Sequence, residues 1–301
     1  MSHIGTVEQT LVEAAQKLEA NKVYCGHGTD NTWDEACLLF LHCRGLESAD
    51  ESILNELIEP EIKAAFEQLI EQRIESRVPA AYLIGEAEFA GLRFKVDERV
   101  LVPRSPIAEL IFRKFRPWIS QDPGHILDLC TGSGCIGIAS ALAFPDSRAI
   151  LTDLSVDALA VAEENIQRHQ LKDRCQLIES DIFANLAGLS FDLILSNPPY
   201  VDQTDLDEMP AEYHKEPAIG LAAGRDGLDI LRPMLMQAAE YLNEGGHLVV
   251  EVGNSWVALE EVYAEVPFTW IEFEYGGDGV FILSKEQLLE FQNVFQERAL
   301  A

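Results

Sequence analysis

The clearest chemistry in this chain lies in the sequence Asn-Pro-Pro-Tyr formed by Asn197, Pro198, Pro199 and Tyr200. It directly follows the apolar run 191–196, and the two prolines must end a strand there because they cannot donate hydrogen bonds to a sheet. In open α/β sheets, ligands bind at the carboxyl ends of the strands. The turn would present an amide side chain, main-chain carbonyls and an aromatic ring at that edge, and these groups suit a planar amide or amine. These residues are therefore the candidate catalytic residues.

A glycine-bearing segment, residues 128–137, follows an earlier apolar run and opens a helix. It lacks the Gly-Lys-Ser/Thr of a Walker loop, and Cys130 stands where a dinucleotide fingerprint has its first glycine. Small residues let the backbone approach a ligand, while Asp128 can take a cationic group or orient the loop. A tight turn without a ligand is the alternative. The candidate binding residues here are Asp128, Cys130, Thr131, Gly132, Ser133 and Gly134.

Two further acidic residues end the next two apolar runs. Asp153 lies about 20 residues beyond Gly132, where an acidic side chain accepts hydrogen bonds from both hydroxyls of a ribose. Asp153 could instead be a helix N-cap, although Ser155 can fill that place equally well. Asp181 is placed to accept from an exocyclic amine. With Asp128 these residues predict a nucleoside pocket, and its candidate contacts are Asp153, Leu154, Asp181 and Ile182.

Hydrophobic periodicity divides the chain into parts that must position these residues. Apolar residues recur at helical spacing through residues 1–77, which predicts a small helical domain suited to substrate recognition. Alternating residues in 82–89, 92–96 and 99–103 predict strands, so that 78–105 form a β-hairpin linker. The predicted helical runs are 7–18, 36–43, 54–62 and 66–74.

Residues 106–301 alternate helices with buried strands, the pattern of an α/β fold with a doubly wound parallel sheet and right-handed crossovers. Two last runs, 270–275 and 280–283, flank Gly276-Gly277-Asp278-Gly279 and predict an antiparallel hairpin at the sheet edge. The predicted helices are 106–119, 134–144, 155–170 and 228–242, and the predicted strands before the hairpin are 125–129, 148–152, 175–178, 193–196 and 247–252.

The composition restricts the partners. The 301 residues carry 22 basic and 51 acidic side chains, a net charge of -29. Nucleic-acid binding depends on Lys and Arg contacts to phosphate, and no basic run provides them, so direct nucleic-acid binding is not expected. The charge serves solubility or attracts a basic macromolecule.

The same composition predicts a cytoplasmic protein. No apolar run approaches the roughly 20 residues of a membrane span, and Met1-Ser2-His3-Ile4 lacks the start of a signal peptide. The cysteines show no metal-binding spacing, so reduced thiols and no metal site are expected. They are Cys25, Cys37, Cys43, Cys130, Cys135 and Cys175.

The glycine loop and the acidic residues at successive strand ends resemble those of the class I S-adenosylmethionine-dependent methyltransferases, over about residues 100–285. This resemblance implies S-adenosylmethionine as cofactor and a mostly parallel seven-stranded sheet that ends in an antiparallel hairpin. The Asn-Pro-Pro-Tyr sequence narrows it to enzymes that methylate a planar nitrogen, in adenine or in a glutamine amide. Such a nitrogen needs acceptors for its N–H bonds, which Asn197 and the Pro198 carbonyl can provide, and Tyr200 can stack on its plane.

Over its whole length the chain resembles the protein N(5)-glutamine methyltransferases. The branch that modifies peptide chain release factors typically has Pro-Arg-Pro-Asp-Thr-Glu, whereas residues 103–111 here read Pro-Arg-Ser-Pro-Ile-Ala-Glu-Leu-Ile, with Cys130 in the loop. Both features match the branch that modifies ribosomal protein L-three, a basic protein that would be the partner. Release-factor methylation, adenine methylation and a non-enzymatic assembly role are the alternatives. The family implies substrate or cofactor contacts for Phe89, Arg104 and Glu216, with a plain core role as the alternative for Phe89.

Overall fold

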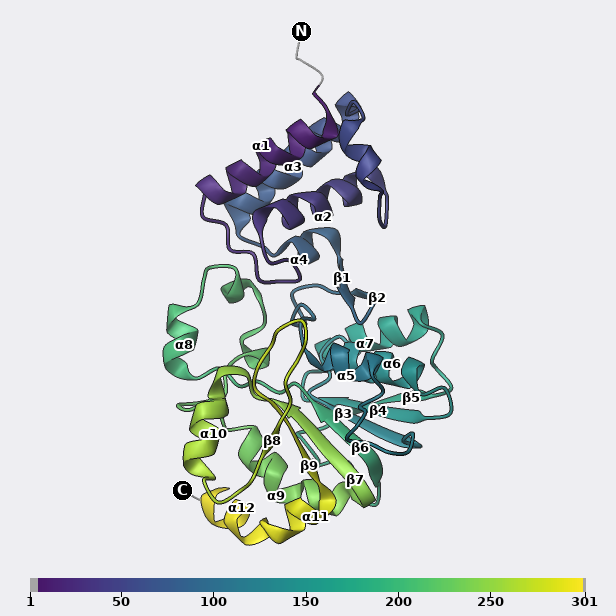
Figure 1. The fold of residues 1–301 in the computed structure, drawn as a ribbon, viewed down its shortest axis with the longest axis vertical. Helices are drawn as coiled ribbons and strands as arrows, with labels where there is room; N and C mark the ends of the chain where they lie inside the picture. Colours follow the sequence, from purple (N-terminus) through teal and green to yellow (C-terminus); the bar gives the residue numbers. More distant parts are fainter. Residues whose placement is uncertain (1–4, 300–301) are drawn as a thin grey trace.

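The computed structural model describes residues 5–299 and shows a helical module above an α/β domain (Figure 1). Residues 1–4, on which the prediction about secretion rests, lie outside this part. The helices of the module enclose an apolar core of their own, which includes Leu11, Leu39, Phe40 and Phe66. Capping fixes the start of the first helix, because the Thr6 side chain accepts from the Gln9 N–H in a capping box. The elements are α1 (Val7–Ala20), α2 (Thr32–Arg44), the 3-10 turn η1 (Glu51–Asn55) and α3 (Pro60–Ser76).

One helical run of the module was predicted wrongly. Residues 54–62 do not form a helix, because the chain passes from η1 through an isolated antiparallel bridge between Thr6 and Leu57. Pro60 occupies the first position of α3. A proline has no N–H to give to a preceding turn and disfavours helical backbone at the residue before it, so the helix starts there.

The linker contains the predicted hairpin, formed by β1 (Glu86–Phe89) and β2 (Leu92–Lys95) in antiparallel register. Two details of the prediction were wrong. Tyr82 lies in the short helix α4 (Ala80–Ile84), which the buried residues Ala80 and Ala81 favour. Residues 99–103 are not a strand, because the Val102 N–H donates to the side chain of Glu216 at 2.9 Å instead of to a neighbouring strand.

The seven-stranded sheet confirms the predicted α/β fold. Its order is β5-β4-β3-β6-β7-β9-β8, with β9 antiparallel to both of its neighbours. The strand order reverses between β3 and β6, the kind of switch point at which open α/β sheets bind ligands. The strands are β3 (His125–Leu129), β4 (Arg148–Asp153), β5 (Cys175–Glu179), β6 (Phe191–Ser196), β7 (Leu242–Glu251), β8 (Thr269–Trp270) and β9 (Val280–Ser284).

Helices cover both faces of this sheet (Figure 1). Alternate residues of one strand enter different cores: Leu193 and Leu195 pack on one face, whereas Ile194 packs on the other. The helices are α5 (Ile107–Phe112), α6 (Cys135–Ala143), α7 (Val156–Arg168), α8 (Gln203–Glu208), α9 (Leu231–Tyr241), α10 (Trp256–Val262), α11 (Lys285–Glu290) and α12 (Gln292–Ala299), with 3-10 turns η2 (Tyr213–Lys215), η3 (Ala218–Gly220) and η4 (Gly253–Ser255).

Helix α5 is shorter than the predicted helix 106–119. It ends at Phe112, after which Lys114 and Phe115 have φ of 50° and 57°. These positive φ values are incompatible with a continued right-handed helix, and Pro117 further along has no N–H for a helical ladder. Across residues 5–299, none of the helices combines the length and the apolar character that crossing a bilayer requires.

Candidate functional site

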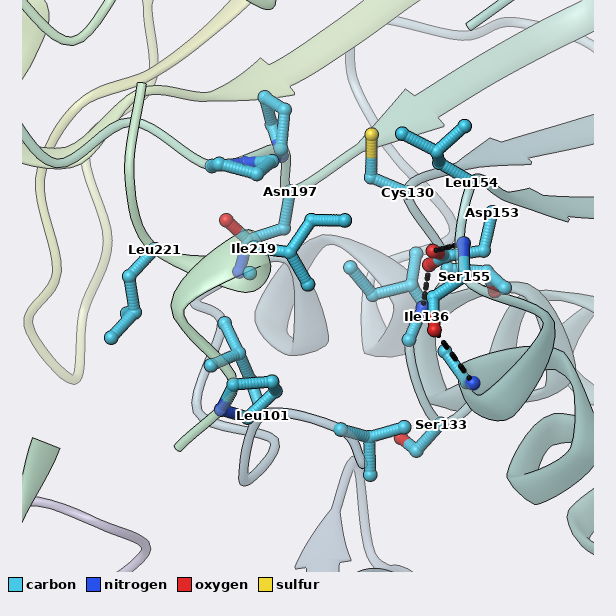
Figure 2. Close-up of a pocket in the computed structure, with 18 of the residues that line it drawn as sticks. Leu101, Cys130, Ser133, Ile136, Asp153, Leu154, Ser155, Asn197, Ile219 and Leu221 are labelled. Carbon is cyan, nitrogen blue, oxygen red and sulfur yellow. Dashed lines mark hydrogen bonds between the residues drawn. The ribbon is translucent and has the colours of Figure 1, made fainter. Parts of the chain in front are cut away.

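A pocket opens at the carboxyl ends of the strands beside the switch point between β3 and β6 (Figure 2). One side is formed by residues 130–133, 153–155 and 180–182, which directly follow or end β3, β4 and β5. The other side is formed by segments outside the strands, residues 197–201 and 217–221 among them. We call these the strand-end side and the loop side. Figure 2 shows Asp153 and Leu154 on the strand-end side. It shows Asn197, Ile219 and Leu221 on the loop side.

The pocket brings together most of the residues that the sequence singled out. Those that line it are Cys130, Thr131, Gly132, Ser133, Asp153, Leu154, Asp181, Ile182, Asn197, Pro198, Pro199, Tyr200 and Arg104. Asp128, Gly134, Phe89 and Glu216 are not among its lining residues. Phe89 is only 4% exposed and packs in the core beside Phe94, as its alternative interpretation predicted.

Asp128 lies beneath the glycine loop and is fully buried. Its Oδ2 atom accepts from the Thr131 hydroxyl and, at 2.8 Å, from the Gly137 N–H. Burial raises the pKa of this carboxyl to about 7, against the opposing effect of these two bonds. A Cβ atom at Gly137 would lie 2.7 Å from Leu151 Cγ, so only glycine lets α6 approach β4 this closely. Asp128 therefore orients the loop from below.

Asp153 holds the other end of the same loop. Its Oδ2 accepts from the Gly132 N–H and its Oδ1 from the Ser155 N–H, both at 2.9 Å. The N-cap of α7 is Ser155, whose hydroxyl accepts from the Ala158 N–H, so Asp153 does not serve as the cap. Each carboxylate oxygen retains a lone pair for a ligand. Leu154, 54% exposed, offers an apolar surface next to it.

Asn197 faces this arrangement from the loop side. It directly follows β6, whose last residue, Ser196, donates from its hydroxyl to the Leu129 carbonyl at 2.9 Å and so ties the ends of β6 and β3 together. Within residues 5–299 the half-buried Asn197 amide makes no side-chain hydrogen bond, and neither does the Asp181 carboxylate. A free carbonyl oxygen and a free NH₂ group are therefore available to a ligand.

Tyr200 is held by Glu251, a residue that the sequence analysis missed. The Tyr200 hydroxyl donates to Glu251 Oε1 at 3.1 Å, and the Ser105 hydroxyl donates to Oε2 at 2.5 Å. A Cβ atom at Gly253 would lie 2.4 Å from the Tyr200 ring, so this glycine leaves room for it. The sequence signal was an acidic residue at the carboxyl end of the apolar run 247–252. Glu251 thus fixes the ring against the loop side of the pocket.

Glu251 also makes stability depend on pH. Burial raises its pKa from 4.5 to about 7, although its two hydroxyl donors oppose the shift. The folded state therefore keeps a proton that the unfolded state releases, so the free energy of unfolding falls as pH rises through this window. We expect Glu251→Gln to flatten this decline in urea titrations, with a residual slope of the same sign from Asp128. Glu244→Gln, a change on the exposed end of the same strand, is the control, and an unchanged slope in Glu251→Gln would refute the assignment.

Arg104 and Glu216 bind each other. Two guanidinium nitrogens of Arg104 donate to the two carboxylate oxygens of Glu216 at 2.8 Å and 2.7 Å. His27 approaches the same carboxylate at 3.3 Å. Burial favours the neutral acid, but His27 and Arg104 outweigh it and lower the pKa of Glu216 to about 2. The Glu216 carboxylate is therefore an anion whose partners belong to the protein itself.

The comparisons with known proteins agree with this fold. Residues 109–213 match the family model described as methyltransferase small domain. The solved hMettl16 catalytic domain in complex with MAT2A 3'UTR hairpin 6 has the same fold, with a TM-score of 0.51 at 17% identity over 76% of this chain and 83% of that one. The chain is a methyltransferase with the class I α/β fold.

Two relatives of known name match almost the entire chain. The ribosomal protein uL3 glutamine methyltransferase of Francisella tularensis is 46% identical over 300 residues, which cover 99% of this chain and 96% of the relative. That of Bordetella pertussis is 41% identical over 291 residues, covering 95% and 97%. The chain belongs to the family of ribosomal protein uL3 glutamine methyltransferases.

Proposed function

We propose that this enzyme transfers a methyl group from S-adenosylmethionine to the side-chain amide nitrogen of a glutamine in ribosomal protein uL3. The observation that carries the proposal is the pocket between β3 and β6, where the unengaged Asn197 amide lies opposite the Asp153 carboxylate. The full-length similarity to enzymes named for uL3 supports the choice of acceptor.

The strand-end side of the pocket fits the cofactor. The carboxylate of Asp153 would accept from the ribose hydroxyls, Leu154 and Ile182 would pack on the base, and Asp181 would accept from its exocyclic amine. The backbone of residues 130–133, held by Asp128 and Asp153, would lie along the amino-acid part. When bound, S-adenosylmethionine supplies an electrophilic methyl group on a sulfonium.

The loop side fits a glutamine amide. The nitrogen lone pair of an amide is delocalised, so attack requires a fixed orientation of the NH₂ group and close alignment with the methyl group. Asn197 Oδ1 and the Pro198 carbonyl would accept the two N–H bonds, and the Tyr200 ring would cover the amide plane. Because Glu251 holds the Tyr200 hydroxyl, the ring is oriented before the substrate arrives. The nitrogen is cationic after the transfer and loses its proton readily, so the proposal requires no dedicated base.

An assay with an isotopically labelled methyl donor distinguishes between uL3 and a release factor as acceptor. The enzyme is incubated with this donor and with purified uL3 or a purified release factor, and label in uL3 at a glutamine side chain is the expected result. Label in the release factor alone would overturn the choice of acceptor, and label in neither would overturn the proposal.

We assign recognition of the acceptor to the helical module, residues 1–77. Modification during ribosome assembly would take place in the cytoplasm, which stays a prediction.

We expect methylation of uL3 to depend on ionic strength. The enzyme carries a net charge of -29, and a basic ribosomal protein would be attracted to it. Raising salt from about 20 to 300 mM shortens the Debye length and should lower the initial rate at subsaturating uL3 by about tenfold. The rate at saturating uL3 should change little and serves as the control. A subsaturating rate that does not respond to salt would rule out electrostatic steering.

A further inference from the structure

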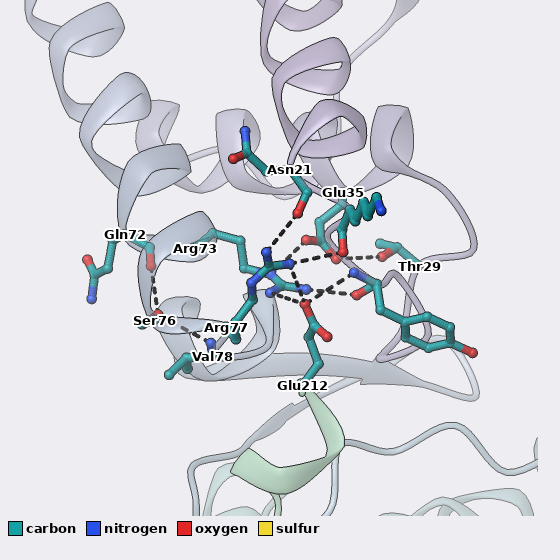
Figure 3. Close-up of polar contacts among 11 residues, drawn as sticks. Asn21, Thr29, Glu35, Gln72, Arg73, Ser76, Arg77, Val78 and Glu212 are labelled. Atoms are coloured by element: carbon teal, nitrogen blue, oxygen red, sulfur yellow. Dashed lines mark hydrogen bonds and ion pairs between the residues drawn. The ribbon is translucent and has the colours of Figure 1, made fainter. Parts of the chain in front are cut away.

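Glu212 connects the helical module to the segment that follows α8, and Figure 3 shows its contacts. Its Oε1 atom accepts from the Tyr24 N–H at 3.2 Å, from Arg73 Nη1 at 3.4 Å and from Arg77 Nη1 at 3.3 Å. All three donors belong to the helical module or its end. We call Glu212, Tyr24, Arg73, Arg77 and Glu35 the latch.

The centre of the latch is buried, and its two carboxylates and two guanidinium groups balance in charge. Arg73 is fully buried, and Glu35 and Glu212 are each nearly so. Arg73 Nε donates to Glu35 Oε1 at 2.8 Å, which gives the second buried carboxylate a partner. Burial alone would raise the pKa of Glu212, but the Tyr24 N–H and the two arginines outweigh it and the pKa is lowered. The arginine side chains therefore meet a carboxylate anion supplied by the catalytic domain, with little water to weaken the attraction.

The chain between the latch and the pocket is short and held throughout. Residues 213–216 follow Glu212, and the Tyr213 ring lies 4.5 Å from the His27 ring and 5.2 Å from the Arg104 guanidinium. Residues 217–221 then form part of the loop side of the pocket. The Val201 N–H donates to the Leu221 carbonyl at 2.8 Å, so this stretch is bonded directly to the residue after Tyr200.

The strand-end side has a separate support. Among residues 5–299, none of the hydrogen bonds of the latch reaches residues 130–133 or 153–155, which are held by Asp128 and Asp153. A disturbance of the latch should therefore reach the acceptor's half of the pocket and leave the cofactor's half unchanged.

We propose, on the basis of the function proposed above, that Glu212 is a positioning residue through which the helical module sets residues 217–221, the loop side of the pocket that receives the acceptor. The module then has a second role besides recognition, because its arginines determine where this part of the pocket lies. Arg77 takes part in the same way, and Arg73, whose Nε atom is held by Glu35, donates to Glu212 directly.

Two variants and a control test this role. Glu212→Gln keeps the shape of the side chain and removes its charge. Arg77→Gln removes a donor whose side chain is 29% exposed, and it leaves the buried Arg73–Glu35 pair intact, which favours folding. The control is Glu59→Gln, which breaks a carboxylate–arginine pair with Arg44 on the far part of the module. Hydrogen exchange of the amides of residues 218–223 is measured without any acceptor, together with cofactor affinity and the kinetics of uL3 methylation.

In both test variants we expect the amides of 218–223 to exchange about tenfold faster than in the wild type. We expect kcat/KM for uL3 to fall about tenfold and the cofactor Kd to stay within about twofold. Glu59→Gln should match the wild type in all three. Exchange and kcat/KM equal to those of the control would overturn the proposal, and so would an equal loss of cofactor affinity. If the wild type fails to methylate uL3 while exchange of 218–223 accelerates in the variants, the acceptor assignment fails and the positioning role of the latch is upheld.

Discussion

Asn197→Ala is expected to lower kcat by about a hundredfold to a thousandfold, the loss typical for removal of one preorganised polar group beside a reacting centre. The amide of Asn197 makes no side-chain bond within residues 5–299, so alanine at this position leaves no buried partner unsatisfied. The stability of the protein and its affinity for the cofactor should change little. Single-turnover methylation of uL3 measures the loss of activity, thermal unfolding measures the stability, and calorimetric titration measures the affinity for the cofactor.

Asn243→Ala provides a matched control for this variant. Asn243 donates to Asp192 at 2.7 Å near the opposite, amino-terminal end of β6, far from the pocket along the strand. This variant should keep kcat within about twofold and lose some stability, about 1 kcal/mol. Near-normal turnover of Asn197→Ala with the cofactor bound would contradict the proposed orientation of the acceptor amide.

Asp153→Ala is expected to weaken cofactor binding by about a hundredfold. Hydrogen bonds to a charged group contribute about 1.5–3 kcal/mol each, and the variant would lack the bonds between the Asp153 carboxylate and the ribose hydroxyls. The substitution would also release the Gly132 N–H, which donates to the Asp153 carboxylate at 2.9 Å in the wild type, so the loop backbone would lose its alignment. Isothermal titration with S-adenosylmethionine gives the Kd directly, without any protein acceptor.

The exposed residue Asp157 provides the control for Asp153. It lies in the first turn of α7, in the same βα unit, and does not line the pocket. Asp157→Ala should keep the cofactor Kd within about twofold. An Asp153→Ala protein that is folded and binds the cofactor as tightly as the wild type would remove Asp153 from the site. Asn197→Ala and Asp153→Ala together distinguish the two sides of the pocket, because one should change kcat and the other the cofactor Kd.

The parts of the site that directly follow strands could be predicted from the sequence because their signals are local. The two prolines after residue 196 end β6, and the glycines after residue 129 turn the chain into α6. Each of these effects depends on a few consecutive residues, and the parallel fold then brings all strand ends to one edge. The same argument placed Asp153 and Asp181 correctly at the pocket, since each of them ends or follows a strand.

Residues whose role depends on a distant partner were not predicted in the same way. Phe89 was a candidate contact, yet the hairpin directs it into the core. Glu216 was a candidate substrate contact, yet its carboxylate binds Arg104, which lies more than 100 residues earlier in the chain. Glu251 gave only the signal of an acidic residue at the end of an apolar run, and Glu212 gave none beyond its acidic type. Nothing in the neighbouring sequence shows that Tyr200 or Arg73 would face them.

The sequence alone therefore determined the fold class and the edge of the sheet that forms the pocket, and it predicted the kind of nitrogen that the turn at Asn197 would accept. The tertiary structure decided which polar groups are free and which are already bonded. Asn197 makes no side-chain bond within residues 5–299, whereas Tyr200 is held by Glu251 and Glu216 by Arg104. The physical reason is that strand ends and turns follow from local backbone geometry, whereas buried carboxylates acquire their partners only when segments more than 50 residues apart pack together.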